Sequence, residues 1–157
     1  MSVSVKLDYW ELIMCVQAGA MRRIENIVKN NPSLMPKENA WEADIEAAMA
    51  EYAVAKTINE VWYGKGSPRQ MDVGRNNQVR HTLIPHGRLI VQKDDNEDNI
   101  YWLVTGCDGQ YQVHGWINGK DAKKTEYWDN PRLDWPAFFV PQDKLNSVES
   151  YLGETNA

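Results

Sequence analysis

Three polar side chains are close together in sequence, around a predicted turn in residues 72–82. Asp72 supplies a carboxylate, Gln78 an amide and Arg80 a guanidinium. Side chains alternate along a strand, so Gln78 and Arg80 are expected on one face, and the turn could bring Gln78 beside Asp72. Carboxylate and amide oxygens suit Mg²⁺ or Mn²⁺, and a guanidinium can hold a phosphate through two hydrogen bonds. The stretch therefore predicts a cation site that handles phosphoryl groups.

A second carboxylate is expected from a helix over residues 41–62. Glu51 lies in the middle of the apolar face of that helix, which also carries Ala47, Val54, Ala55, Ile58 and Trp62. A carboxylate in such a place must be paired, reach solvent or bind a cation. If the helix packs on the face that carries Gln78 and Arg80, Glu51 becomes the third group of the site. The Val79 carbonyl would add another oxygen ligand.

Positive charge is concentrated around this stretch. The chain has a net charge of −5, which argues against a generic nucleic-acid binder, yet residues 64–93 hold six Lys or Arg residues and one acid. A basic segment around an acid suits phosphate binding, and the alternative is a solvated hairpin with scattered arginines. Tyr63, Tyr111 and Trp116 could stack on bases, with core packing as the alternative. The candidate nucleic-acid contacts are Lys65, Arg69, Arg75, His86 and Arg88.

The histidines and cysteines follow no metal-binding spacing. His81, His86 and His114 are far apart and are expected to be structural or surface groups. Cys15 and Cys107 are expected to be buried, reduced thiols of a cytoplasmic protein. The chain has no run of 18 apolar residues and no secretory signal pattern at its start, so we expect no membrane partner.

The pattern of apolar and turn residues predicts one α+β domain with a mixed sheet. Residues 7–29 predict an amphipathic helix on the spacing of Trp10, Ile13, Met14, Gln17, Ala20, Ile24, Ile27 and Val28. After the helix at 41–62, strands are expected at 70–73, 78–82, 88–92, 100–105 and 110–117. A short helix near 121–127, a strand at 137–140 and a helix at 141–152 follow. Within the domain, residues 1–40 form an N-terminal helix and loop, 41–152 the core, and 153–157 a frayed tail.

The order of these residues resembles the PD-(D/E)xK, or restriction-endonuclease-like, superfamily. That family has a helical Glu, an Asp at a strand end, and (Glu/Asp/Gln)-x-Lys on the next strand. Glu51, Asp72 and Gln78 match this plan, and Arg80 stands at the lysine position. From about residue 45 to residue 145 the chain is similar to small phage-encoded members. The resemblance implies a restriction-endonuclease-like core, with about five strands in a mixed sheet, flanking helices and an extra N-terminal helix.

The resemblance also implies a function. It implies a Mg²⁺- or Mn²⁺-dependent DNA endonuclease or phosphodiesterase, acting in the cytoplasm of an infected host cell. The catalytic residues would be Glu51, Asp72, Gln78 and Arg80, with Glu51, Asp72, Gln78 and the Val79 carbonyl as cation ligands. Many proteins of this fold dimerise, so a homodimer is a further expectation.

Two positions depart from the family pattern. Gln78 replaces the usual acid and Arg80 the usual lysine, which predicts weaker cation binding and low or absent activity. Lys56 or Lys93 are candidates for a relocated ammonium group. One alternative is a non-catalytic protein of the same fold that binds nucleic acid or a host protein. Another is an unrelated α+β protein that carries the motif by chance.

Overall fold

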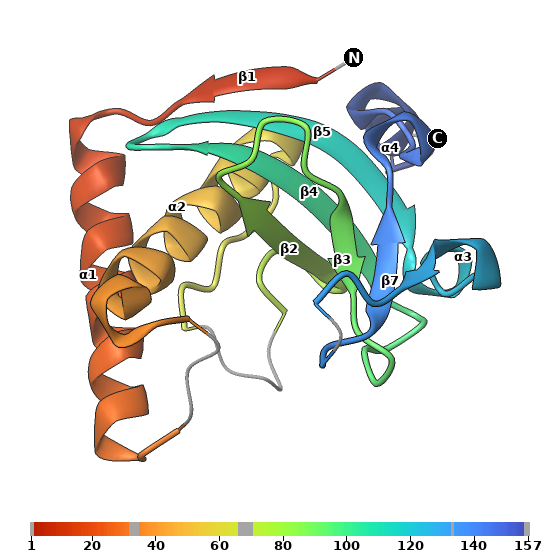
Figure 1. Ribbon diagram of the computed structural model, residues 1–157. Helices are drawn as coiled ribbons and strands as arrows, with labels where there is room; N and C mark the ends of the chain where they lie inside the picture. The colour runs from red at the N-terminus through yellow and green to blue at the C-terminus, as the bar shows by residue number, and fades with distance from the viewer. Residues whose placement is uncertain (1, 32–34, 66–70, 133, 156–157) are drawn as a thin grey trace.

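The computed structural model describes residues 2–31, 35–65, 71–132 and 134–155, which form a mixed α+β fold (Figure 1). A four-stranded sheet has the order β1–β5–β4–β2, and a smaller sheet has the order β3–β7–β6. The helices are α1 (Tyr9–Val28), α2 (Ala40–Ile58), α3 (Gly119–Ala122) and α4 (Val148–Thr155). The strands are β1 (Val3–Lys6), β2 (Asn77–Thr82), β3 (Leu89–Val91), β4 (Ile100–Cys107), β5 (Gln110–Asn118), β6 (Trp128–Asp129) and β7 (Ala137–Val140).

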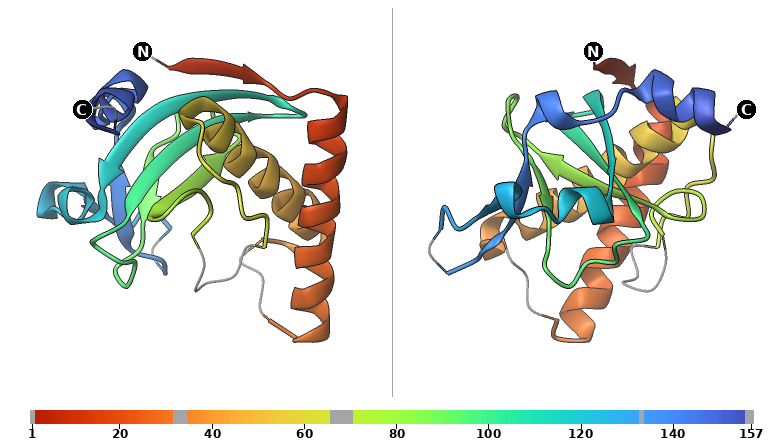
Figure 2. Two further views of the ribbon diagram at one scale, coloured as in Figure 1. Left: turned by 180° about the vertical axis from the view of Figure 1, so that it is seen from behind. Right: turned by 90° about the vertical axis from the view of Figure 1, so that its right-hand side faces the viewer.

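The four-stranded sheet separates two apolar clusters. Helix α2 lies along one of its faces with α1 packed against α2, and β3 and β7 lie on the other side (Figures 1 and 2). Val54 of α2 and Trp102 of β4 belong to the cluster beneath the helices. Leu103, the next residue of β4, packs with Leu89 and Val140 in the second cluster. Alternate side chains of β4 thus serve opposite cores, as the two-residue period of a strand requires.

The polar turn before β2 is built by backbone hydrogen bonds. The amide of Val73 donates to the carbonyl of Asn77, and the amide of Asn77 donates back to Val73, each at 3.2 Å. Gly74 has φ +60°, a conformation that glycine adopts without steric cost. Strand β2 then runs parallel to β4 at the edge of the sheet, with Gln78 opposite Tyr101. The turn therefore holds Asp72 beside the open edge of β2.

The predicted strand at 70–73 and the predicted end of the second helix were wrong in detail. Residue 70 lies outside the described residues, and Val73 forms only isolated bridges, with Trp62 and Asn77. Helix α2 ends at Ile58 because Asn59 adopts a left-handed conformation with φ 56°. Trp62 is thereby released from the helix and turns back toward it.

Helix α1 is oriented against the expectation for an amphipathic helix. Such a helix ordinarily buries its apolar stripe, but α1 buries Cys15, Gly19, Arg22 and Arg23. A Cβ atom added at Gly19 would lie 2.5 Å from the Cα atom of Ile45, so the two helix backbones approach closely at this point. The inner face of α1 is thus small and basic, and its apolar face points to solvent.

Other elements differ from prediction in their extent. Strands β1 and β6 were not predicted, so the expected sheet of about five strands is a four-stranded sheet with a three-stranded companion. The helix expected near 121–127 is replaced by α3 and a separate 3₁₀ turn at Thr125–Tyr127. The helix expected at 141–152 is likewise divided, into a 3₁₀ turn at Gln142–Lys144 and α4, which begins only at Val148 and includes residues 153–155 of the expected tail. Cys15 is buried as expected, whereas Cys107 is exposed at the end of β4. Among the described helices, none is long and apolar enough to cross a bilayer.

Candidate functional site

Glu51 is buried in the middle of α2 and is paired by an arginine from α1. Glu51 is only 5% exposed. Arg22 grips the carboxylate with two hydrogen bonds, from Nη1 to Oε2 at 2.6 Å and from Nη2 to Oε1 at 2.8 Å. The indole Nε1 of Trp62 donates to Oε1 at 3.2 Å. A carboxylate in an apolar stripe must be paired, reach solvent or bind a cation, and Glu51 is paired with Arg22.

Arg22 also ties the segment after α2 to the same site. Its Nε and Nη2 donate to the carbonyl of Gly64 at 3.0 and 2.9 Å. Burial opposes the charge of Arg22, yet its pKa is raised because Glu51 accepts its hydrogen bonds and lies so close. Sequence reasoning missed Arg22. The available signal was the Arg22-Arg23 pair on the side of the helix opposite the apolar stripe.

Asp72 lies close enough to Glu51 for the charges of the two carboxylates to interact. Its Oδ2 accepts a hydrogen bond from the amide of Val79 at 2.8 Å. Burial, and then the negative charge of Glu51, raise the pKa of Asp72 to about 7, although the Val79 amide, Arg80 and Arg22 oppose that rise. Asp72 and Glu51 are thus neighbouring carboxylates, and the Asp72 carboxyl holds a proton far more readily than an ordinary Asp.

Gln78 and Arg80 share a face of β2, but α2 packs on the other face. Arg80 stands opposite Leu103, a residue of the second apolar cluster, whereas Val79 packs against the cluster beneath α2. The side-chain amide of Gln78 approaches the sulfur of Met71 at 3.5 Å. Glu51 and the Gln78–Arg80 pair therefore approach Asp72 from opposite sides of the sheet edge.

Arg80 makes its own set of contacts on that second face. Its Nη2 donates to Asp95 at 2.8 Å and its Nε to the carbonyl of Ile90 at 3.2 Å. The guanidinium carbon lies 5.0 Å from the centre of the Tyr101 ring. Asp95 also accepts a hydrogen bond from the amide of Gln92. Arg80 thus anchors the turn after β3, in addition to its electrostatic influence on Asp72.

The candidate nucleic-acid contacts that the structure describes are exposed but lie apart. Lys65, Arg75, His86 and Arg88 are exposed, and Arg69 lies outside the described residues. Arg75 precedes β2 while His86 and Arg88 follow it, about 20 Å away at the rise of a six-residue strand. Arg88 pairs with Asp129 at 3.3 Å. Arg75 thus lies beyond one end of β2, with His86 and Arg88 beyond the other end, so these residues do not form a compact cluster.

The remaining candidates have structural contacts. The Nε2 atom of His81 hydrogen-bonds with the carbonyl of Gly106 at 2.7 Å, and that of His114 with the hydroxyl of Thr105 at 2.7 Å. Burial lowers the pKa of His114. Lys56 pairs with Glu11 at 2.8 Å. Within the described part of the chain, no three His, Cys, Asp or Glu side chains are grouped as metal ligands.

The aromatic candidates for base stacking divide between core and surface. Tyr111 and Trp116 are buried in the cluster beneath the helices, so core packing explains both. Tyr63 is exposed and lines a surface pocket of about 680 Å³ beside the turn. The pocket is lined by Asn59, Glu60, Val61, Tyr63, Gly74, Arg75, Asn76 and Tyr151.

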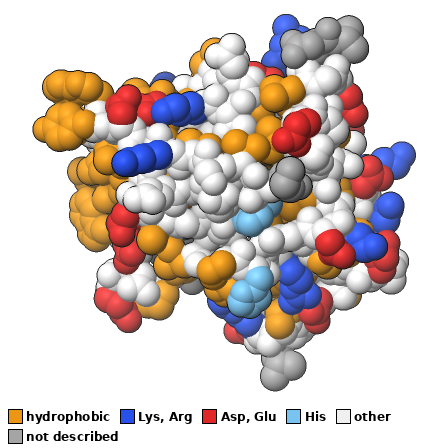
Figure 3. Space-filling model, turned by 90° about the horizontal axis from the view of Figure 1, so that it is seen from above, with side chains coloured by type: hydrophobic (Ala, Val, Ile, Leu, Met, Phe, Trp, Pro, Cys, Tyr) orange, Lys and Arg blue, Asp and Glu red, His pale blue; other side chains and the backbone are white. Residues whose placement is uncertain are grey.

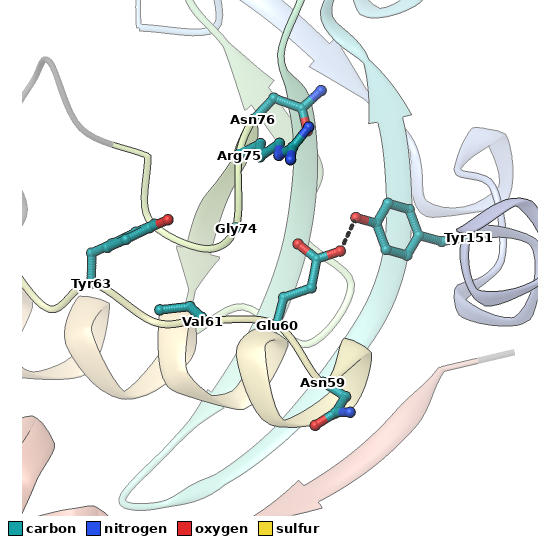
Figure 4. A pocket seen from close by; sticks show the side chains of 8 residues that line it. All are labelled: Asn59, Glu60, Val61, Tyr63, Gly74, Arg75, Asn76 and Tyr151. Carbon is teal, nitrogen blue, oxygen red and sulfur yellow. Dashed lines mark hydrogen bonds between the residues drawn. The ribbon is translucent and has the colours of Figure 1, made fainter. Parts of the chain in front are cut away.

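Glu60 organises this pocket (Figure 4). The Tyr151 hydroxyl donates to its Oε1 at 2.6 Å, and the Asn77 side-chain amide donates to its Oε2 at 3.1 Å. Burial and the hydrogen bond to Glu60 raise the pKa of Tyr151 to about 12. A Cβ atom on Gly74 would lie 1.9 Å from Oε2 of Glu60, so another residue there would push this carboxylate away from its hydrogen bonds. Glu60 therefore fixes the turn that presents Asp72.

Comparisons with family models, with curated proteins and with solved structures found no match to this chain.

Proposed function

We propose that the edge of β2 beside Asp72 is a divalent-cation-dependent phosphodiesterase site that acts on DNA. The observation that carries the proposal is that two largely buried carboxylates from separate elements, Asp72 and Glu51, lie close enough for their charges to interact. Burial and the negative charge of Glu51 together raise the pKa of Asp72 to about 7. A bound cation would relieve the repulsion between the two groups, because it favours both ionised carboxylates.

The donor set suits a hard cation in part. Asp72 has a second carboxylate oxygen beside the one that accepts the Val79 amide. In an extended strand the amide and carbonyl of one residue point the same way, so the Val79 carbonyl faces the same edge. Glu51 is already bound by Arg22 through both of its carboxylate oxygens, so a cation would have to compete with Arg22 for it. When bound, Mg²⁺ or Mn²⁺ would polarise a phosphoryl oxygen and activate water, while Arg22 would be displaced from Glu51 or share it.

Calorimetric titration with Mn²⁺ tests the cation site. We expect Asp72→Asn, which keeps the acceptor for the Val79 amide, to weaken Mn²⁺ binding by at least about 10-fold. Asp94→Asn, in an exposed acidic turn, is the matched control for nonspecific binding and should leave the affinity unchanged. Equal Mn²⁺ affinity in wild type and Asp72→Asn would remove Asp72 from the site.

The arginine variant Arg22→Gln tests the competition for Glu51. If Arg22 competes with the cation for Glu51, this variant binds Mn²⁺ more tightly than wild type, although it folds less stably because a buried carboxylate has lost its partner. Nuclease assays with single-stranded, duplex and branched DNA then test catalysis. Cleavage that survives in Asp72→Asn would point to another site or to a contaminant.

A second candidate function is supported by the same ion pairs. Arg22 with Glu51 and Arg80 with Asp95 neutralise the proposed catalytic groups within the protein. A protein of this fold without catalysis, which binds nucleic acid or a host protein, would need no cation. This function predicts no Mn²⁺ binding in either wild type or Arg22→Gln, and retention of DNA or a host protein in the presence of a chelator.

A further inference from the structure

Helix α1 presents its most apolar face to solvent. Trp10 is 74% exposed and Val28 is 78% exposed, and Met14, Met21 and Ile24 between them are also exposed. Figure 3 looks down on the molecule and shows hydrophobic side chains gathered along its left side, where α1 stands in Figure 1. Polar groups of the inner face hold the helix in this orientation, since Arg22 pairs with Glu51 and Arg23 with Asp44.

The spacing along this face is that of a helix–helix seam. Successive positions are separated by steps of four, three, four, three and four residues, at Trp10, Met14, Gln17, Met21, Ile24 and Val28. The five steps average 3.6 residues, so the mean spacing alone does not set this face apart from that of any straight helix. The positions do repeat every seven residues, in the two sets Trp10, Gln17, Ile24 and Met14, Met21, Val28. A seven-residue repeat is the one by which helices pack along each other in left-handed pairs.

The seam is also symmetric about Gly19. In an antiparallel pair of α1 helices centred there, Trp10 would face the partner's Val28, Met14 the partner's Ile24, and Gln17 the partner's Met21. The small Ala20, beside the centre, would allow close approach of its own copy in the partner. The two Gln17 side chains would lie about 6 Å apart along the axis at 1.5 Å per residue, where a polar pair fixes the register.

The exposed area and the charges favour a second copy of this chain. The seam and the neighbouring Ile27 expose on the order of 700 Å², close to the roughly 800 Å² that each partner buries in a standard interface. A helix that lies on an anionic membrane carries Lys and Arg at its polar border, but the arginines of α1 are buried. Along the seam lie Glu11 and Glu25. Lys56, paired with Glu11 at 2.8 Å, would meet the partner's Glu25.

We propose that the protein is a homodimer formed by the antiparallel packing of two α1 helices about Gly19. The interface is isologous, since the same seam on each copy covers the other. It leaves the edge of β2 and the turn at Asp72 outside the contact, so the proposal is independent of any catalytic function.

Two charge variants test both the interface and its register. In the proposed dimer Met14 of each copy faces Ile24 of the other, so these two residues form two equivalent layers of the seam. Met14→Glu and Ile24→Lys each place a charge in both layers. Each should raise the dimer dissociation constant by about 100-fold or more in sedimentation velocity. Leu83→Lys, at an exposed apolar position after β2, is the matched control and should remain dimeric. Circular dichroism checks that every variant is folded, as expected for positions exposed in the monomer.

A mixture of Met14→Glu and Ile24→Lys distinguishes antiparallel from parallel packing. In the antiparallel dimer the glutamate introduced in one variant faces the lysine introduced in the other, and the second such layer stays native, so mixing should restore a dimer. A parallel pair would put neither charge opposite the other. The proposal is overturned by a wild type that is monomeric at about 100 µM, a concentration well above typical dimer dissociation constants. It is equally overturned by a dimer that tolerates both variants, or by a mixture that stays monomeric.

Discussion

At the scale of single residues, Asp72 should make folding depend on pH in an unusual direction. Its pKa is raised from 3.8 to about 7 by burial and by Glu51. A carboxyl group with a raised pKa in the folded protein binds its proton more tightly there than in the unfolded chain. Its contribution to stability is therefore complete below pH about 4 and is lost as pH rises to about 7, a change of roughly 2–4 kcal/mol.

Urea unfolding of wild type and Asp72→Asn at pH 5 and pH 8 measures this contribution. We expect the free energy of unfolding of Asp72→Asn to change less between the two values of pH, and to exceed that of wild type at pH 8. Asp94→Asn, in the exposed turn, should follow the wild-type profile. If the free energy of unfolding changed equally with pH in Asp72→Asn and wild type, ionisation of Asp72 would not destabilise the folded protein.

Glu51 and Asp72 also show what local sequence reasoning can and cannot supply. A carboxylate in an apolar stripe needs a partner, so Glu51 could be singled out from its neighbours alone. Its partner could not, because Arg22 is 29 residues away on another helix. The placement of Gln78 and Arg80 on one shared face of β2 followed from strand periodicity. The packing of α2 on the opposite face depends on which face of the sheet is covered, which periodicity leaves open.

At the scale of elements, the contact between α1 and α2 depends on a glycine. The ends of α1 were predicted well, because Asp8 caps the helix and its side chain accepts the amide of Glu11. The face of α1 that packs on α2 could not be predicted, since an apolar stripe shows that one side of a helix tends to be covered but not by which element. The burial of Gly19 and two arginines in place of that stripe is explained by close approach to Ile45 and by pairing with Glu51 and Asp44.

Substitution of Gly19 tests this contact. Alanine favours a helix interior by about 1 kcal/mol over glycine, but its Cβ atom at Gly19 would lie 2.5 Å from the Cα of Ile45. We expect Gly19→Ala to destabilise the protein by about 1–2 kcal/mol in urea unfolding, because overpacking against backbone costs more than the propensity gains. Gly153→Ala, where nothing lies within 4 Å, is the matched control and should stabilise by up to about 1 kcal/mol. Stabilisation by both changes would show that the helices separate freely.

At the scale of the whole molecule, the α+β class and the main strands follow from periodicity, whereas the closure of the fold does not. Strand β1 has four residues and pairs with β5 more than 100 residues away. Such a strand has too little pattern of its own, and its partner is set by the tertiary fold. The C-terminal helix is a similar case, because its place depends on Tyr151, which contacts residues from several distant elements.

Tyr151 joins these distant elements in one contact, so its variants measure how the fold is closed. Its ring packs edge-on against Trp102 and Trp116, with centroids 5.1 and 5.9 Å away. Its hydroxyl donates to Glu60 at 2.6 Å and accepts from Asn77 at 3.2 Å. Tyr151→Phe should cost about 1.5–3 kcal/mol, because a charged acceptor loses its donor. Tyr151→Ala should cost about 3–5 kcal/mol, because it also leaves a cavity.

Urea unfolding followed by tryptophan fluorescence measures both losses, since Trp102 and Trp116 report directly on the site. Glu154→Ala, exposed on the same helix, should be near neutral and controls for helix α4 itself. The Asn77 side chain links the loss to the candidate site, because it also accepts the indole hydrogen bond of Trp102 at 2.8 Å and ends the turn that carries Asp72. Tyr151→Phe should therefore also shift the pH dependence that Asp72 contributes. If Tyr151→Phe were as stable as wild type and its stability depended on pH in the same way, the Tyr151 hydroxyl would contribute neither to closing the fold nor to holding the turn that carries Asp72.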